Sequence, residues 1–218
     1  MTTTILQKCP LFKNLDDKDL KEALAFFHAE VKQYKRGAFL HRAGTPMVKF
    51  GLLLSGSVHV YMDDFDGNQM LMASVVPGIT FGESLCYLEE VPQVYIECMS
   101  DCTVLVMDTY NLKHLPKMPT PLETSLLQRF TAMLAQRTLS LNDRIQILSK
   151  LTIREKVITL LSQQAVQAGS DHFTLPFSRE AMAVYLGVNQ NALSRVLSEM
   201  QKDGVIAFKG NDFKILLQ

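Results

Sequence analysis

Ser178-Arg-Glu-Ala-Met-Ala-Val-Tyr-Leu-Gly-Val-Asn-Gln-Asn-Ala-Leu-Ser-Arg-Val-Leu197 is the stretch that decides the fold of the C-terminal third. Its pattern predicts two short helices joined by a tight turn. Ser178 is a good helix cap, and the helix dipole favours Glu180 in the first turn. Gly187 can supply the positive φ of the turn, and Asn189 can cap the second helix. We therefore expect a helix-turn-helix here.

The second predicted helix has one apolar side and one polar side. The inward stripe of the motif is expected to consist of Met182, Leu186, Leu193 and Val196. The outer face then carries Gln190, Asn191, Ser194 and Arg195. In this motif such a face lies in the major groove of DNA, where arginine can pair with guanine and an amide with adenine or a phosphate. The alternative is an ordinary helical hairpin whose small residues serve packing alone.

A β-hairpin is predicted directly after these helices. Residues 205–208 and 213–217 are strand-like, and Lys209-Gly-Asn-Asp212 is a turn between them. A hairpin in this position fits the wing of a winged helix-turn-helix. The residues expected to contact DNA are Ser178, Arg179, Asn189, Gln190, Asn191, Ser194, Arg195 and Lys209.

Upstream of this motif, residues 122–151 contain neither glycine nor proline, which predicts one long helix. Its apolar residues recur at spacings of three, four and seven, and Arg137 and Arg144 interrupt them. The stripe can pack on its own barrel alone, or it can form the seam of a coiled-coil dimer, which the near-heptad spacing favours. The predicted dimer interface is Leu127, Phe130, Leu134, Leu141, Ile145 and Leu148. Thr152 and Glu155 form a capping box, so a new helix is expected there, with Leu151 as a hinge.

The first half of the chain changes from a helical pattern to a β pattern near residue 31. Before that point, leucines at helical spacing follow Asn14 and Asp16, either of which can act as a cap. From residue 31 to about 108, short β-branched or aromatic runs alternate with glycines, which is typical of a sandwich or barrel. The runs are 49–54, 57–62, 69–76 and 102–107, with Asp66-Gly67 as the clearest hairpin turn.

Bulk composition fits a globular protein without membrane association. Of the 218 residues 47% are hydrophobic, and neither a signal peptide nor an apolar run long enough for a membrane span is present, so a cytoplasmic location is expected. Net charge is zero, but there are 14 basic and 16 acidic residues before Lys150, and 8 basic and 6 acidic residues from there on. This asymmetry is a weak sign of nucleic-acid binding.

Several stretches together resemble the cyclic-AMP receptor and fumarate-nitrate regulator (Crp/Fnr) family. They are residues 53–60, 64–69, 77–85 and 177–206. The resemblance implies an α+β chain with an N-terminal cyclic-nucleotide-binding-like jelly-roll β-barrel, a long dimerisation helix and a C-terminal winged helix-turn-helix. The corresponding boundaries are 1–120, 121–150 and 151–218. The implied function is an effector-controlled transcription regulator that binds a palindromic double-stranded DNA operator as a homodimer, with RNA polymerase as a further candidate partner.

The chain departs from the family where the effector binds. Cyclic-nucleotide-binding members have an Arg-Ser pair about ten residues after Gly-Glu, and its arginine neutralises the phosphate. Here Gly82 and Glu83 are kept, but Gln93 and Val94 stand at the Arg-Ser positions, so we predict a small-molecule effector other than cyclic AMP. The expected pocket residues are Gly82, Glu83, Ser84, Gln93, Val94, Leu141 and Asn142.

Recognition-helix identity also departs from the family. Asn191 replaces the acid of the common Glu-x-x-Ser-Arg, while Ser194 and Arg195 carry over. A carboxylate accepts from cytosine whereas an amide both donates and accepts, so the half-site preference is expected to shift at that base.

Neither an iron–sulfur cluster nor haem or another metal is expected. The iron–sulfur members use clustered N-terminal cysteines, and this N-terminus has only Cys9. Cys98 and Cys102 are either inert buried thiols or a redox-sensing pair. The five histidines show no ligand spacing, and no catalytic motif is present, which argues against a metal-dependent jelly-roll enzyme. A sensory module that acts through protein contacts is the other alternative class.

Overall fold

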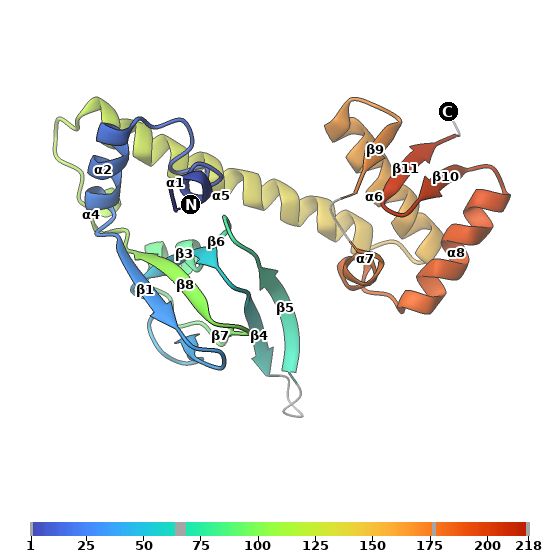
Figure 1. Cartoon of the computed structure of the whole chain (residues 1–218), viewed down its shortest axis with the longest axis horizontal. Helices are drawn as coiled ribbons and strands as arrows, with labels where there is room; N and C mark the ends of the chain where they lie inside the picture. Colours follow the sequence, from blue (N-terminus) through green and yellow to red (C-terminus); the bar gives the residue numbers. More distant parts are fainter. Residues whose placement is uncertain (1, 64–68, 176–177, 217–218) are drawn as a thin grey trace. The chain divides into compact units, whose positions relative to one another are not determined.

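The chain divides into two units, Met1–Leu134 and Ala135–Gln218, in a computed structural model that describes residues 2–63, 69–175 and 178–216 (Figure 1). The division falls inside one long helix, α5 (Pro121–Leu148). Each unit has its own cluster of buried apolar side chains. The predicted segment 121–150 is therefore shared between the two units, and each is described by itself below.

The first unit is a β-sandwich of two antiparallel four-stranded sheets. One sheet has the order β1 (Glu30–Tyr34), β8 (Cys102–Met107), β3 (Phe50–Ser55), β6 (Thr80–Phe81). The other has the order β2 (Phe39–His41), β7 (Tyr95–Cys98), β4 (Val58–Asp63), β5 (Gln69–Val75). Leu52 and Val104 from the first sheet and Val58 and Ile96 from the second are buried in one cluster, so the two sheets pack face to face. The predicted jelly-roll is confirmed.

This unit also contains short helices. They are α1 (Thr2–Leu6), α2 (Asp17–Phe26), α3 (Glu83–Leu88) and α4 (Tyr110–Lys113). Of the two candidate caps for α2, it is Asp16 that accepts from the Asp19 N–H, at 2.8 Å. The predicted runs 49–54, 57–62, 69–76 and 102–107 became β3, β4, β5 and β8. The predicted turn at Asp66-Gly67 lies outside the described residues.

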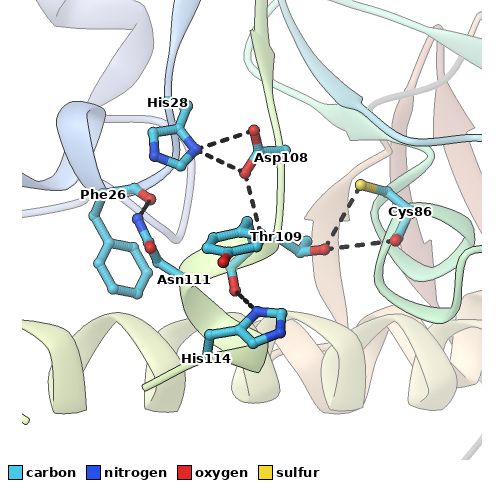
Figure 2. Close-up of polar contacts among 8 residues, drawn as sticks. Phe26, His28, Cys86, Asp108, Thr109, Asn111 and His114 are labelled. Carbon is cyan, nitrogen blue, oxygen red and sulfur yellow. Dashed lines mark hydrogen bonds and ion pairs between the residues drawn. The ribbon is translucent and has the colours of Figure 1, made fainter. Parts of the chain in front are cut away.

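A group of polar contacts ties α2, β8 and α4 together (Figure 2). The Nδ1 atom of His28 lies 3.1 Å from both carboxylate oxygens of Asp108, and Asn111 Nδ2 donates to the Phe26 carbonyl at 2.7 Å. On the other side Thr109 Oγ1 donates to the Cys86 carbonyl at 3.5 Å, which connects the same segment to α3. These contacts fix the chain just before it enters α5.

The N-terminal half of α5 belongs to the core of the first unit. Leu126, Phe130 and Met133 are buried, and the ring centre of Phe130 lies 6.2 Å from that of Phe50 and 5.7 Å from that of Tyr87. The barrel itself therefore takes up the apolar stripe of this half of the helix.

The second unit comprises the rest of α5, then α6 (Ile153–Ala168), β9 (His172–Thr174), α7 (Arg179–Leu186), α8 (Gln190–Lys202), β10 (Ile206–Lys209) and β11 (Asp212–Ile215). The three strands form an antiparallel sheet in the order β10-β11-β9. Thr152 and Glu155 make the predicted capping box at the start of α6. Ile147 of α5 is fully buried in this unit's core.

Candidate DNA-binding and effector sites

Helices α7 and α8 form the predicted helix-turn-helix. Ser178 Oγ accepts from the Ala181 N–H at 3.1 Å, which caps α7. Gly187 ends that helix at φ +62°, in the left-handed region where a side chain would be strained. Asn189 Oδ1 then accepts from the N–H groups of Asn191 and Ala192 at 2.9 and 3.3 Å, which caps α8. Three local signals in the sequence therefore set the turn.

The two sides of α8 differ as predicted, with one correction. Gln190, Asn191, Ser194 and Arg195 are all exposed. Leu193 is buried, but Val196 is only half-buried; the deeper inward residues are Leu197 and Met200. The spacing of four and seven residues from Leu193 could have identified these two. The polar face at the N-terminal end of α8 is thus free for contact with another molecule.

The wing is a hairpin with a third strand that the sequence analysis missed. Lys209 is exposed and lies opposite Asp212 across the two-residue turn, where Gly210 has φ +61°. Strand β9 adds to the hairpin through β11, and Thr174 Oγ1 donates to the Asp212 carboxylate at 2.5 Å. Three residues are too few for a recognisable strand pattern, so tertiary pairing decides β9.

Arg179, one of the predicted DNA contacts, is half-buried beneath the wing. Its Nη2 donates to the Gly210 carbonyl at 3.0 Å. The guanidinium carbon lies 5.2 Å from the ring centre of Phe208 and 5.4 Å from that of Phe213, and burial lowers the pKa of Arg179. Arg179 therefore fastens the wing to α7, and its contact with DNA stays a prediction.

The start of α3 carries Gly82 and Glu83, the two predicted pocket residues that match the family pattern. Gly82 has φ +79°, and a Cβ atom there would lie 2.5 Å from Met47 Sδ, so both backbone conformation and space require glycine. Glu83 follows as the first residue of α3 with only 1% of its surface exposed. The other three barrel residues expected in the pocket are Ser84 and Gln93, which are exposed, and Val94, which is half-buried.

The residues expected on α5 differ in their surroundings. Phe130 is buried in its own barrel core, while Leu127 and Leu134 are half-buried against that core. Leu141, Ile145 and Leu148 belong to the second unit and are exposed, the first two by about 60% (61% and 62%). Asn142 is also exposed. Packing on the barrel accounts for the first half of the stripe. The second half is exposed within its own unit, and its role as a dimer seam stays a prediction.

All four cysteines lie in the described part of the chain, are buried and form no disulfide. Burial raises the pKa of Cys98 to about 12 and also raises that of Cys86, which disfavours the reactive thiolate. Cys102 Sγ donates to the Ser57 carbonyl at 3.3 Å. Over the described ranges no group of three or more His, Cys, Asp or Glu side chains is arranged to hold a metal ion, and no helix is long and apolar enough to span a membrane.

The chain combines a barrel that contains a buried glutamate, a long helix, and a winged helix-turn-helix whose polar face is exposed. This combination defines a DNA-binding transcription regulator with an effector-binding domain. Comparison with known proteins agrees with this class. Residues 31–117 match the family model of the cyclic nucleotide-binding domain, and residues 155–217 match that of the Crp-like helix-turn-helix domain. The chain belongs to the Crp/Fnr family, whose members are transcription regulators and not enzymes.

Its relatives are distant. The chain is 25% identical over 211 residues to the probable transcriptional regulator flp of Lacticaseibacillus casei, covering 95% of this chain and 91% of the relative. It is 20% identical to the cAMP-activated global transcriptional regulator CRP of Pasteurella multocida, covering 84% and 88%. Among solved structures, the c-di-GMP responsive regulator CLP of Xanthomonas campestris matches with a TM-score of 0.59 at 20% identity, covering 93% and 100%. Catabolite activator protein of Thermus thermophilus matches with a TM-score of 0.54 at 22% identity, covering 94% and 93%. These structural matches establish the shared fold.

Proposed function

We propose that this chain is a homodimeric, effector-controlled regulator that binds a pseudo-palindromic DNA operator. The observation that carries the proposal is the exposed polar face at the capped N-terminal end of α8. Gln190, Asn191 and Arg195 there offer the amide and guanidinium groups that hydrogen-bond base edges. The hydroxyl of Ser194 donates to the Gln190 carbonyl at 3.0 Å, so it is already partly engaged by the helix.

Dimerisation is proposed through the open half of the α5 stripe. Leu141 and Leu148 in this half stand seven residues apart, the repeat of a coiled-coil seam, and Ile145 lies between them at a spacing of four and three. A symmetric pair would present two recognition helices to successive major grooves about 34 Å apart. The predicted operator is therefore an inverted repeat.

Effector control is proposed to act through the barrel. The ligand is proposed to bind close to Glu83. It would shift the domain equilibrium by the difference between its affinities for the two states. Cyclic AMP is not the expected effector because Gln93 and Val94 provide no charge for its phosphate.

Two further expectations follow from operator binding. A regulator of this kind works where the chromosome is, which in a bacterium is the cytoplasm. RNA polymerase is the natural candidate partner of such a protein at a promoter.

The test is selection of bound duplexes from a random DNA library at one fixed, moderate salt concentration, because non-specific phosphate binding depends steeply on salt. Wild type should enrich an inverted repeat, and Arg195→Ala should enrich it weakly. Lys202→Ala, at the other end of α8, is the matched control and should enrich the same repeat. Equal enrichment by wild type and Arg195→Ala would contradict the assignment of α8 as the reading helix.

A further inference from the structure

His41 lies on the inner face of the sheet β2-β7-β4-β5. It stands opposite Ile96 of β7, which stands opposite Val60 of β4. Directly opposed residues in antiparallel strands point to the same face of a sheet. Ile96 is buried in the barrel core and Val60 packs against that core, so this row faces the interior.

The neighbouring row faces outward and provides the contrast. Glu97 stands opposite Phe39 on one side and His59 on the other. The hydroxyl of Tyr61 donates to the Glu97 carboxylate at 2.8 Å on this outer face. Two histidines of one sheet thus lie on opposite faces, His41 inside and His59 outside.

The His41 side chain is buried without full hydrogen bonding. Only 8% of the residue is exposed, and its Nε2 atom has no hydrogen-bond partner among the described residues. Burial lowers the pKa of His41, so the imidazole is neutral at neutral pH. A buried polar atom that lacks a partner costs free energy, and a ligand that supplies the missing partner recovers it.

The segment that begins at His41 borders both parts of the expected effector pocket. Gly44 N–H donates to the Pro92 carbonyl at 3.0 Å, directly before the Gln93-Val94 pair. Farther along, Met47 Sδ lies against Gly82, 2.5 Å from where a Cβ atom would stand. His41 is the last residue of β2, and the segment that directly follows it makes both of these contacts.

The charge of the barrel interior points to the kind of ligand. The buried polar and charged side chains of the described residues are His41, Thr80, Glu83 and Thr109. This set contains neither lysine nor arginine, and His41 is neutral. A buried anion needs a compensating charge, which these residues do not offer. An uncharged ligand fits this interior better than a phosphate.

We propose that His41 is a specificity-determining residue of the effector pocket, and that this pocket takes an uncharged small molecule with an apolar body and one polar group that hydrogen-bonds His41 Nε2. The inference rests on the proposed function, since it names the ligand class of the proposed effector site. On this proposal His41 contributes to ligand binding and does not contribute to the stability of the fold.

The test is the thermal unfolding midpoint of the full chain in the presence of cell metabolites. A small-molecule extract of the source cells is passed over ion-exchange resins to give uncharged, anionic and cationic pools. The uncharged pool should raise the midpoint of wild type, and His41→Leu should need about tenfold more of it, since one buried hydrogen bond is lost. His41→Gln, which keeps a donor and an acceptor, should fall between the two.

His59→Leu makes the same chemical change on the outer face and should respond like wild type. Without any pool, His41→Leu should unfold at or above the wild-type midpoint, because it removes an unpaired buried nitrogen; a lower midpoint would indicate a structural role and overturn the proposal. Stabilisation by a charged pool instead, an equal response of His41→Leu, or no stabilisation by any pool would also overturn it.

The DNA selection separates this proposal from the proposed function. If the selection depends on Arg195 while the response to metabolites ignores His41, the regulator assignment stands and the His41 proposal fails. If His41 governs the response but no duplex is enriched with the uncharged pool present, the ligand site stands and the regulator assignment fails.

Discussion

The N-terminal end of α8, which we propose reads DNA, and the interior of the barrel use polar residues in opposite ways. On α8 the polar side chains are exposed, and the caps at Ser178 and Asn189 satisfy the helix ends. In the barrel, Glu83 and His41 are buried, and the Nε2 of His41 lacks a partner among the described residues. An exposed polar face can bind different partners after small changes in its side chains, whereas a buried polar group binds only a ligand that complements it.

This difference explains why the family resemblance is informative at one end and not at the other. The helix-turn-helix needs residue types at fixed local spacings, so the resemblance transfers directly. The effector pocket depends on single side chains, and the two departures from the family pattern, Gln93 and Val94, predict that the phosphate site is lost. DNA binding can thus be inferred from the class of the protein, while the identity of the effector has to be inferred from this chain's own buried residues.

The largest expected effect is on operator binding when the proposed dimer seam on α5 is disrupted. Leu141→Glu places a charge in the proposed dimer seam and should convert the protein to a monomer. Loss of the second recognition helix should weaken operator binding by about 10²- to 10⁴-fold. Sedimentation and fluorescence anisotropy measure the two quantities. Leu139→Glu is the control, because Leu139 is also exposed but two residues away, on nearly the opposite side of α5. A dimer that survives Leu141→Glu would disprove this seam.

A smaller effect is expected at the reading face alone. Asn191→Glu should change the preferred base at one position of each half-site by about tenfold or more, toward cytosine, because a carboxylate accepts from the cytosine amino group. The rest of the operator should stay the same. Competition binding with operators altered at single positions measures this. A uniform loss over all sequences would instead mean that Asn191 contacts the DNA backbone.

Removing the N-terminal cap of α6 should modestly lower the stability of the second unit. The Thr152 hydroxyl accepts from the Glu155 N–H at 3.2 Å, and a Glu155 carboxylate oxygen accepts from the Thr152 N–H at 3.0 Å. Thr152→Ala should lower the free energy of unfolding by about 1 kcal/mol. Thr152→Ser keeps the cap and should be close to wild type. Chemical denaturation followed in the second unit decides between a working cap and an irrelevant one.

The smallest expected effect is a pH dependence of the stability of the barrel that comes from His41. Burial holds the pKa of His41 below 6.5 in the folded protein. As the pH falls, the unfolded chain therefore binds a proton at this residue before the folded chain does. The contribution of neutral His41 to stability is complete above pH 6.5 and is lost as the pH falls through the lowered pKa. Between pH 7.5 and 5.5, wild type should therefore lose more stability than His41→Leu. Denaturation curves at both pH values test this, and parallel losses in the two proteins would refute it.

The sequence predicted the parts of the fold that local chemistry determines. The capped helices, the Gly187 turn, the capping box at Thr152 and four of the eight barrel strands follow from residue type and spacing. The other four barrel strands, β1, β2, β6 and β7, and strand β9 of the second unit were not predicted. β2, β6 and β9 have only two or three residues, too few to show a period, and pairing with distant strands defines them.

The candidate site was predictable to a similar degree. The exposed residues of α8 follow from helical periodicity, but the buried state of Phe130 and the clamp made by Arg179 depend on packing between distant segments. His41 escaped for the same reason. A lone histidine in a short strand gives no signal until pairing with Ile96 places it inside the barrel.

The central claim, a dimer that reads two half-sites, is tested most directly by half-site spacing. Affinity is measured for the selected inverted repeat and for the same repeat with five base pairs inserted between its halves. That insertion turns one half-site by about half a helical turn, to the opposite side of the duplex. The account predicts at least a hundredfold loss of affinity. Equal affinity for the two duplexes would contradict it.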